Sequence, residues 1–255
     1  MNKKELVEQL LTSNRGARVL IWGPSGTGKT YFGLTFPGVK IYDFDGGLLT
    51  GVSKDLPEFV DASSYESFRG AGAFEQFLRD WKADIKNPKI QTLFIDSLTS
   101  LSDHMMRTVL KLDGKDVDSN PKIQHWGSLI NQLRTLFYSA VAESGTKNLV
   151  VSAHSQILAD DEEGKVKYVP LIAGKKLPDR IGLWFDEVYH AEVAGMQSAR
   201  KFRLATIGCQ QYDAKSRIKS FAPLETFEPN DWRIIWAKAS KALGELRESL
   251  KTTST

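Results

Sequence analysis

Four short apolar segments, each bounded by polar or glycine residues, recur along the first part of the chain. They span residues 19–22, 39–42, 90–95 and 148–153 and are rich in β-branched side chains, as is typical of buried parallel strands. Between them lie stretches compatible with helices, at residues 28–36, 73–85, 98–111 and 123–143. This alternation predicts an α/β fold with a mostly parallel central sheet flanked by helices.

The pattern changes after His154, where apolar and polar residues alternate. Residues 156–160 and 165–170 flank a Glu-Glu-Gly turn, and residues 183–193 and 200–207 continue the alternation. Period-two alternation around turn residues is typical of hairpins. We therefore expect antiparallel hairpins to extend the sheet in the C-terminal half.

The two ends of the chain have helical patterns of their own. Leucines at positions 6, 10 and 11 predict a short leading helix at about residues 3–13, and Asn230 or Asp231 can cap a last helix at 232–250. The expected organisation is an N-terminal helix at 1–16, a core at 17–228, and a C-terminal helix and tail at 229–255.

The most specific motif directly follows the first apolar segment. It is a glycine-rich loop of the form G-x-x-x-x-G-K-[ST], whose backbone N–H groups can surround a phosphate while Lys29 adds a positive charge and the Thr30 hydroxyl can hold Mg²⁺. The expected nucleotide-binding residues are Gly23, Pro24, Ser25, Gly26, Thr27, Gly28, Lys29, Thr30 and Tyr31. The ligand is ATP or GTP, and the lack of an evident guanine-specific motif favours ATP.

Carboxylates follow two of the predicted strands. The strand at 92–95 ends in Asp96, which in a parallel sheet would sit beside the phosphate loop of a neighbouring strand and orient Mg²⁺ as a Walker-B residue. The second predicted strand leads into Asp43 and Asp45, which period-two alternation puts on one face. Asp45 is the better candidate to polarise the attacking water, and the alternative is that both are solvated turn residues.

The fourth predicted strand leads into His154. At the same sheet edge as the other polar groups, His154 could sense the γ-phosphate and pass its presence to the following hairpin. A structural, hydrogen-bonded histidine is the alternative.

Two groups of basic residues complete the candidate chemistry. Lys215 and Arg217 lie on one face if extended, and could stabilise phosphoryl charge in a neighbouring subunit's site. A second group could contact a nucleic-acid backbone, with a tyrosine to stack on a base. This DNA-binding group is Lys165, Lys167, Tyr168, Lys175, Lys176 and Arg180. Residues 113–126 form a weaker second candidate, and solvated charge is the alternative for all of these residues.

Composition adds only broad limits. A chain of 255 residues with 41% hydrophobic positions can bury the core of one large domain, and a net charge of +3 is too small to establish a nucleic-acid partner. One cysteine excludes an internal disulfide framework and favours a reducing compartment, so we expect the cytoplasm. No apolar run reaches the length of a membrane span, so we expect no membrane association.

Taken together, these motifs resemble the RecA-like P-loop ATPase superfamily, and most closely the core-only RecA/RadA-like phage proteins of single-strand annealing and recombination. The resemblance covers roughly residues 17–224. It rests on the glycine-rich loop, on Asp-Phe-Asp-Gly-Gly at 43–47, on Leu-Phe-Ile-Asp-Ser at 93–97, on the strand ending at His154, and on Ala-Lys-Ser-Arg at 214–217.

The resemblance implies a ring or filament with ATP between subunits, and a phage protein that acts in the host cytoplasm on single-stranded DNA, with a single-strand-binding protein as a possible partner. It also implies DNA-binding loops at residues 113–126 and 159–180, and the Lys-x-Arg pair resembles the trans-acting pair of hexameric replicative helicases. The chain departs from the usual pattern by carrying Asp45 in place of glutamate and His154 in place of glutamine. We also expect no separate DNA-binding domain at either end.

Three functions remain open from the sequence. One is a slow, DNA-stimulated ATPase that coats single strands and promotes annealing or recombination. Another is a nucleotide-switched assembly or regulatory protein that binds no DNA, and the third is a hexameric helicase or packaging-type motor. Salt-dependent affinity for single strands would separate the first and third functions from the second.

Overall fold

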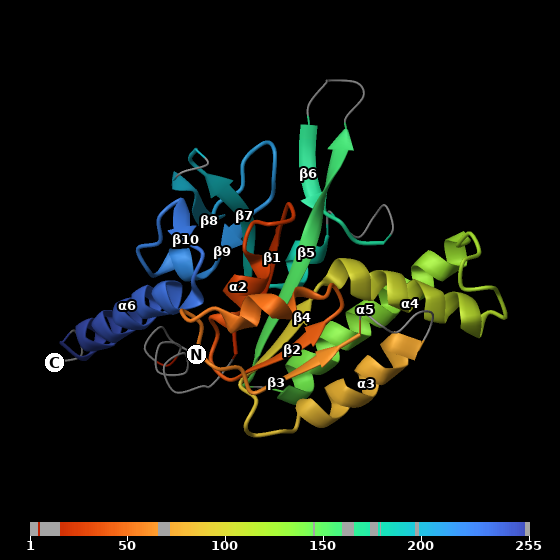
Figure 1. The fold of residues 1–255 in the computed structure, drawn as a ribbon. Coiled ribbons are helices and arrows are strands. Elements are labelled where there is room, and N and C mark those ends of the chain that lie inside the picture. The colour runs from red at the N-terminus through yellow and green to blue at the C-terminus, as the bar shows by residue number, and fades with distance from the viewer. Residues whose placement is uncertain are drawn as a thin grey trace.

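Buried strands form the centre of the computed structural model, and helices cover them on both sides (Figure 1). The structure describes residues 5, 16–65, 72–144, 146–159, 166–173, 178, 180–196 and 199–252. The fold is the predicted α/β fold, with a mostly parallel sheet, flanking helices and antiparallel strands in the C-terminal half. The leading helix predicted at 3–13 lies outside the described residues, apart from Glu5.

The central sheet has the order β10-β8-β7-β1-β5-β4-β2-β3. Every neighbouring pair from β7 to β3 is parallel, whereas β8 and β10 continue the sheet antiparallel. Off this path, β6 pairs with β5 and β9 pairs with β7, both antiparallel. The strands are β1 (Arg18–Gly23), β2 (Val39–Asp43), β3 (Asp61–Ser64), β4 (Thr92–Asp96), β5 (Asn148–Ala159), β6 (Val166–Pro170), β7 (Glu187–Ala194), β8 (Lys201–Ala205), β9 (Lys215–Ser216) and β10 (Phe227–Pro229).

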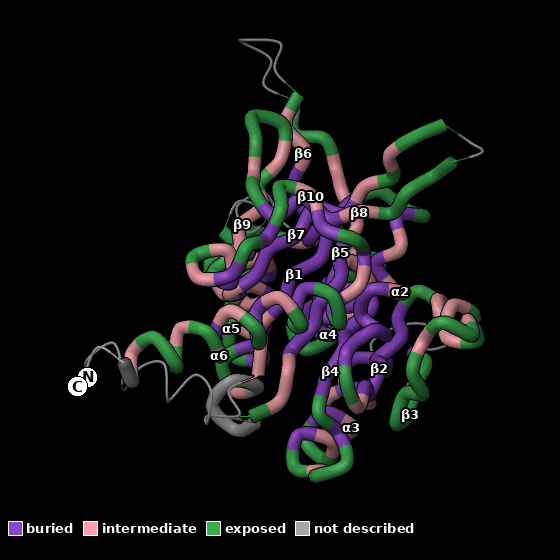
Figure 2. Tube along the Cα trace, turned by 90° about the vertical axis from the view of Figure 1, so that its left-hand side faces the viewer, coloured by how far each residue is buried: buried purple, intermediate pink, exposed green. Residues whose placement is uncertain are grey.

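Two apolar clusters fill the spaces between the sheet and its helices. Successive side chains of a strand point to opposite faces, so Leu20 and Trp22 of β1 pack on one side, and Val19 and Ile21 on the other. Figure 2 shows these central strands as buried. The first cluster lies under α3 (Gly72–Asp84), α4 (Leu98–Leu112) and α5 (Ile123–Ser144), and the second lies under α2 (Lys29–Leu34) and α6 (Trp232–Thr252). Short 3₁₀ helices are η1 (Gly47–Val52), η2 (Ile181–Trp184) and η4 (Ile218–Ser220).

The C-terminal half differs from the sequence prediction in three ways. Residues 148–153 and 156–160, expected as two strands, form the single strand β5, whose end leaves the sheet to pair with β6. The strand expected at 183–193 begins only at Glu187, because residues 181–184 turn as η2. It pairs parallel to β1, not antiparallel. Beyond these three differences, the short strands β3, β9 and β10 were not predicted; β3 lies in the N-terminal half.

The strand order corrects the expected neighbour of β4, although Asp96 at its end does lie beside the phosphate loop. We expected β4 to lie next to the strand that carries the phosphate loop, but β5 lies between β1 and β4. Since β1, β5 and β4 run parallel, their carboxyl ends still meet at one edge of the sheet. This edge collects the polar residues that follow each strand.

The last helix begins as predicted, with a cap from Asp231, whose side chain accepts a hydrogen bond from the N–H of Arg233 at 2.9 Å. Trp232 then docks α6 against the end of α2. Its indole stacks on Phe36 with ring centroids 4.4 Å apart, and the backbone N–H of Trp232 donates to Thr35 Oγ1 at 2.9 Å. None of the helices in the described part of the chain is both long and apolar enough to cross a membrane.

The docking of α6 is testable by substitution of its two tryptophans. Because Trp232 is buried in the second cluster, Trp232→Ala should lower the free energy of unfolding by about 3–5 kcal/mol. Trp236 lies on the same helix but is 47% exposed, so Trp236→Ala should cost about 1 kcal/mol or less. Chemical denaturation followed by circular dichroism measures both, and equal losses would contradict the buried contact.

Candidate functional site

The glycine-rich loop turns tightly between β1 and α2. Gly26 and Gly28 adopt left-handed conformations, with φ of 75° and 82°, which glycine reaches without steric cost. At Gly28 a Cβ would lie 2.4 Å from Nδ2 of Asn230, whose side chain donates a hydrogen bond to the Gly28 carbonyl at 2.8 Å. The loop is thus fixed from outside by a residue at the start of α6.

Lys29 lies at the first position of α2 and is largely buried. Its ammonium group donates to the carbonyls of Gly23 and Pro24, at 3.0 and 2.8 Å, and so lies along the inside of the loop. Burial lowers the pKa of Lys29, while Asp96 and Asp45 oppose that shift. A positive charge is therefore held where burial strengthens its attraction for an anion.

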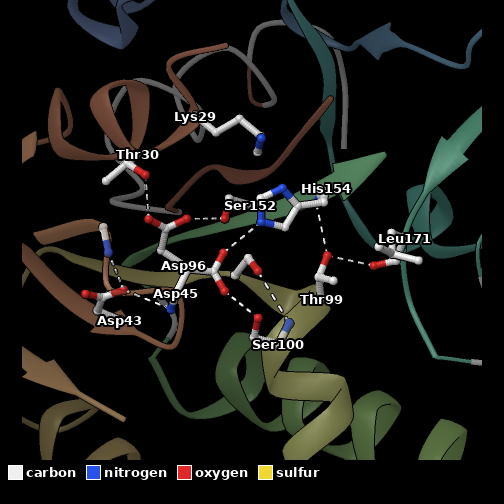
Figure 3. Close-up of polar contacts among 12 residues, drawn as sticks. Lys29, Thr30, Asp43, Asp45, Asp96, Thr99, Ser100, Ser152, His154 and Leu171 are labelled. Atoms are coloured by element: carbon white, nitrogen blue, oxygen red, sulfur yellow. Dashed lines mark hydrogen bonds and ion pairs between the residues drawn. The ribbon is translucent and has the colours of Figure 1, made fainter. Parts of the chain in front are cut away.

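Asp96 joins the phosphate loop to two strand ends. Thr30 Oγ1 donates to one of its carboxylate oxygens at 2.7 Å, and Ser152 on β5 donates to the other. Figure 3 shows Asp96 between these two hydroxyl groups. Burial raises the pKa of Asp96, although both hydrogen bonds oppose that shift. The strand end, the loop and β5 are therefore tied together by one buried carboxyl group.

Asp43 and Asp45 do not act as a pair on one face, as the sequence pattern suggested. Strand β2 ends at Asp43, which is buried and accepts backbone N–H groups of Asp45 and Gly47, each at 3.1 Å, and of Leu48 at 3.3 Å. Asp43 is therefore neither solvated nor free to act on a ligand, because it holds the turn into η1.

Asp45 instead points toward His154 and α4. Its carboxylate accepts from His154 Nε2 at 3.0 Å and from the Ser100 hydroxyl (Figure 3). Burial alone would raise the pKa of Asp45, but hydrogen bonds from His154, Ser100 and Ser97 outweigh it and lower the pKa. Asp45 thus stays ionised at neutral pH, at the same sheet edge as Asp96.

His154 is also held through its backbone. Its N–H donates to Thr99 Oγ1 at 3.0 Å, and the Thr99 hydroxyl donates to the Leu171 carbonyl at 2.7 Å. Leu171 follows β6, and its own N–H donates to the His154 carbonyl at 2.7 Å. His154 therefore lies where the β5–β6 hairpin leaves the sheet, with its imidazole directed at Asp45.

Oxygen ligands suitable for Mg²⁺ lie at the junction of the loop and β4. The Thr30 hydroxyl and the Asp96 carboxylate are hard donors of the kind Mg²⁺ prefers, and Mg²⁺ often takes only one or two protein ligands beside phosphate oxygens and water. Within the described residues no group of three or more His, Cys, Asp or Glu side chains could hold a metal ion. The pair therefore fits a magnesium ion that is bound together with a nucleotide.

Lys215 and Arg217 lie at the opposite edge of the sheet. Strand β9 ends at Ser216 and Arg217 is αR, so the two cations are not consecutive residues of one extended face. Arg217 donates to Asp186 at 2.7 Å, and Asp186 also pairs with Arg18 at the amino end of β1. Burial lowers the pKa of Lys215, and the nearby Arg217 lowers it further. Arg217 therefore lies at the amino end of β1, whereas the phosphate loop follows the carboxyl end of that strand.

Of the six residues predicted to contact DNA, the structure describes three. Lys167 and Tyr168 lie on β6, and Lys167 pairs with Asp213 at 3.0 Å. Arg180 is exposed just before η2. Lys165, Lys175 and Lys176 lie outside the described residues.

In the weaker candidate loop, at 113–126, His125 Nδ1 accepts the Lys122 N–H at 2.9 Å and Nε2 donates to Asp113 at 3.0 Å. This contact closes the turn between α4 and α5.

Sequence reasoning did not identify several hydroxyl groups at the site. Ser152, Thr99 and Ser100 contact Asp96, His154 and Asp45 respectively. Ser152 had a usable signal, because it precedes His154 by two positions on a strand. Thr99 and Ser100 lie in the first turn after Asp96, and nothing in a single sequence distinguishes them from ordinary residues of a helix start.

Comparison with known proteins adds one finding. Residues 15–218 match the model of a family described as AAA domain. This span includes β1, the glycine-rich loop, Asp45, Asp96, His154 and Arg217. No curated protein was found to match the chain.

The buried carboxyl group of Asp96 makes a testable difference to stability. Because its pKa is raised on folding, its contribution to the free energy of unfolding falls as the pH rises above about 4, the ordinary aspartate value. Asp96→Asn should therefore stabilise the protein at pH 7, and by less at about pH 4. Denaturant titration without nucleotide or Mg²⁺ measures this effect.

Asp43→Asn is the matched control at the neighbouring strand end. It should lower the free energy of unfolding by about 1 kcal/mol, because three backbone N–H groups lose a charged acceptor. Destabilisation of both variants at pH 7 would contradict a net cost of burying Asp96.

Proposed function

The chain belongs to the AAA domain family and is a P-loop, nucleotide-binding ATPase, and from that premise we propose a RecA-like ATPase that assembles on single-stranded DNA. The observation that carries the proposal is the hydrogen bond of 2.7 Å between Thr30 of the phosphate loop and Asp96 at the end of β4. This contact joins the two groups that a nucleotide and its metal ion require. Asp45 and His154 complete the same sheet edge.

The proposed substrate is ATP with Mg²⁺. Backbone N–H groups of residues 23–30 and the Lys29 ammonium would hold the phosphates, since a tight loop at a helix start directs N–H groups at an anion. Thr30 and Asp96 would hold the metal ion, which supplies charge neutralisation on the phosphates when bound. Tyr31, in the first turn of α2, lies next to this site.

Asp45 is proposed to orient the attacking water. A carboxylate with a lowered pKa is a weak base but a good hydrogen-bond acceptor, so its role would be to fix the water in line and not to remove a proton early. Aspartate is one methylene shorter than glutamate, which moves the carboxylate about 1 Å from its usual position and favours slow turnover.

His154 is proposed to sense the γ-phosphate. Its ring already contacts Asp45, its backbone carbonyl accepts the N–H of Leu171 after β6, and its own N–H donates to Thr99 of α4. A γ-phosphate that competed for the His154 ring or for Asp45 would break the hydrogen bond between them. Because the hairpin starts at His154, this change could reach the hairpin. Nucleotide state could thereby reach the segments proposed to bind DNA.

Lys215 and Arg217 are proposed to act on the nucleotide of a neighbouring subunit. Arg217 lies at the amino end of β1 beside Arg18, whereas the phosphate loop follows the carboxyl end of β1, and six residues of strand separate these edges by about 17 Å. An arginine side chain cannot span that distance. Lys215 lies level with Leu20, part of the way along this strand. A ring or filament would bring one subunit's Arg217 edge to another subunit's loop, which supports oligomerisation with shared sites.

Single-stranded DNA is the proposed activator, and annealing or recombination in the host cytoplasm is the proposed role, with a single-strand-binding protein as partner. Support comes from the position of Lys167 and Tyr168 on a hairpin that rises from His154, projecting from the body in Figure 1. Of the other residues predicted to contact DNA, Arg180 is exposed just before η2, and Lys165, Lys175 and Lys176 lie outside the described residues. Lysine side chains and an aromatic ring on one hairpin are suited to a sequence-independent contact, although the acidic residues at 160–163 of the same hairpin oppose it.

Two observations on the β5–β6 hairpin favour a second function, a nucleotide-switched assembly protein without DNA binding. Lys167 is paired with Asp213, which reduces its attraction for a phosphate, and apolar side chains are exposed on the same hairpin. These side chains are Ile157, Leu158 and Val166. An exposed apolar hairpin suits a protein contact as well as it suits a strand of DNA.

The rate of ATP hydrolysis with and without single-stranded DNA separates these functions. We expect stimulation at about 50 mM salt that fades by about 200 mM, because the contact is with phosphates. Lys165, Lys175 and Lys176 changed together to alanine should remove the stimulation and spare basal hydrolysis. The control changes three exposed lysines near the end of α3, at 82, 86 and 89. If single-stranded DNA neither changes the hydrolysis rate nor binds at low salt, the DNA-dependent function is contradicted and the nucleotide-switched assembly protein is favoured.

Mixing two inactive variants tests the shared site. Lys29→Ala should abolish hydrolysis, and Arg217→Ala should reduce it by at least about 10³-fold while sparing ATP binding. In a 1:1 mixture, about a quarter of the interfaces in a head-to-tail assembly would combine an intact loop with an intact Arg217 and regain activity. Arg79→Ala, on the surface of α3, is the control for loss of an arginine. No recovery at any ratio would contradict action in trans.

A further inference from the structure

The loop at residues 208–214, between β8 and β9, contacts two segments that are distant in sequence. Two backbone hydrogen bonds of 2.9 Å close this 208–214 loop, from Gly208 N–H to the Ala214 carbonyl and from Cys209 N–H to the Tyr212 carbonyl. Its residues touch β1 immediately before the phosphate loop, and β6 of the hairpin. It then leads directly into Lys215 of β9. The functions proposed above use only the Lys167–Asp213 pair of these contacts and do not explain why one loop joins β1 to β6.

The first contact is an aromatic stack that starts at the phosphate loop. Trp22 is fully buried, directly precedes Gly23, and donates from Nε1 to the Asp213 carbonyl at 3.2 Å. Its ring meets the His190 ring edge-on, with centroids 4.7 Å apart. Tyr212 stacks on His190 at 4.2 Å with an interplanar angle of 11°. A continuous set of packed rings thus runs from the start of the loop to Tyr212.

The second contact is with the edge of β6 that faces away from β5. Tyr168 donates its N–H to the Gln211 carbonyl at 2.6 Å and forms a parallel bridge with Tyr212. Lys167 pairs with Asp213 at 3.0 Å. Tyr212 and Asp213 therefore contact both segments. On the β6 side they meet Tyr168 and Lys167, and on the β1 side Tyr212 stacks on His190 while Asp213 accepts from Trp22.

His190 is the central ring of this stack and is held in place by packing. It is buried, and among the described residues its Nδ1 has no hydrogen-bond partner. Burial lowers its pKa, Glu192 opposes that shift, and the nearby Lys29 lowers it further. The ring is therefore neutral at neutral pH, and packing against Trp22 and Tyr212 fixes its position. Close-packed rings transmit small shifts because no space is available to absorb them.

We propose that Tyr212 is a positioning residue that couples nucleotide binding at the phosphate loop to the position of β6, by a route separate from His154. The route runs from Gly23 through Trp22 and His190 to Tyr212, and from there to Tyr168. The proposal rests on nucleotide binding at the phosphate loop, as proposed above, and does not depend on DNA. Each step is a direct packing or hydrogen-bond contact, which is the physical continuity that coupling between sites requires.

Hydrogen exchange of the full-length protein, with and without ATP and Mg²⁺, tests this route. Nucleotide should change exchange at amides 166–169 by about threefold or more in the wild type. Tyr212→Ala should abolish that change, yet retain the change at amides 155 and 156 beside His154. Tyr212→Phe keeps the stacked ring and should restore the response. Tyr138→Ala, an exposed tyrosine on α5, is the matched control.

The outcomes separate this proposal from the function on which it rests. Nucleotide affinity is measured on every variant, so failure of the wild type to bind ATP would overturn the proposed ATPase site itself. Binding by the wild type without any change at β6, or an equal change in Tyr212→Ala, would overturn only the coupling. Tyr212→Leu replaces the ring with an apolar side chain without stacking, and serves the same purpose if Tyr212→Ala does not fold.

Discussion

The hydrogen bonds from Thr30 and Ser152 to Asp96 are the constraint on which the site depends. The sheet order separates β1 from β4 by β5, so the phosphate loop and the acid of β4 cannot be fixed by direct strand pairing. One buried carboxyl group makes the connection instead, to the first turn of α2 on one side and to β5 on the other. Burying that acid costs stability, as its raised pKa indicates, and such a cost is common where a charge is kept for ligand binding.

The strands and helices that surround this constraint could be predicted from the sequence. Buried runs such as β1 and amphipathic helices such as α4 carry enough periodic signal to identify them within one or two residues. Pairing partners carry no such signal, so the insertion of β5 between β1 and β4 and the parallel orientation of β7 appear only in the structure. Short strands such as β9 depend on neighbours and not on their own residues.

The candidate site was predictable to the extent that its residues follow strands. Lys29, Thr30, Asp96, Asp45 and His154 meet at one edge, as parallel strands require. Alternation failed to separate Asp43 from Asp45, because β2 ends at Asp43 and the chain turns there. Hydrogen-bond partners in a following helix, such as Ser100, depend on how that helix packs. A single sequence specifies the acids of the site but not the hydroxyl groups that orient them.

The ion pairs of Arg217 are compatible with its proposed action on a neighbouring subunit. Asp186 accepts Arg18 through two hydrogen bonds and Arg217 through one. Arg217 is 62% exposed in its side chain, and an exposed ion pair contributes only about 0–1 kcal/mol. Departure of Arg217 toward a neighbouring phosphate would leave Asp186 still paired with Arg18, so no buried charge would lose its partner. The shared acid therefore holds Arg217 in a defined direction while opposing its release only weakly, which is the balance a residue acting in trans requires.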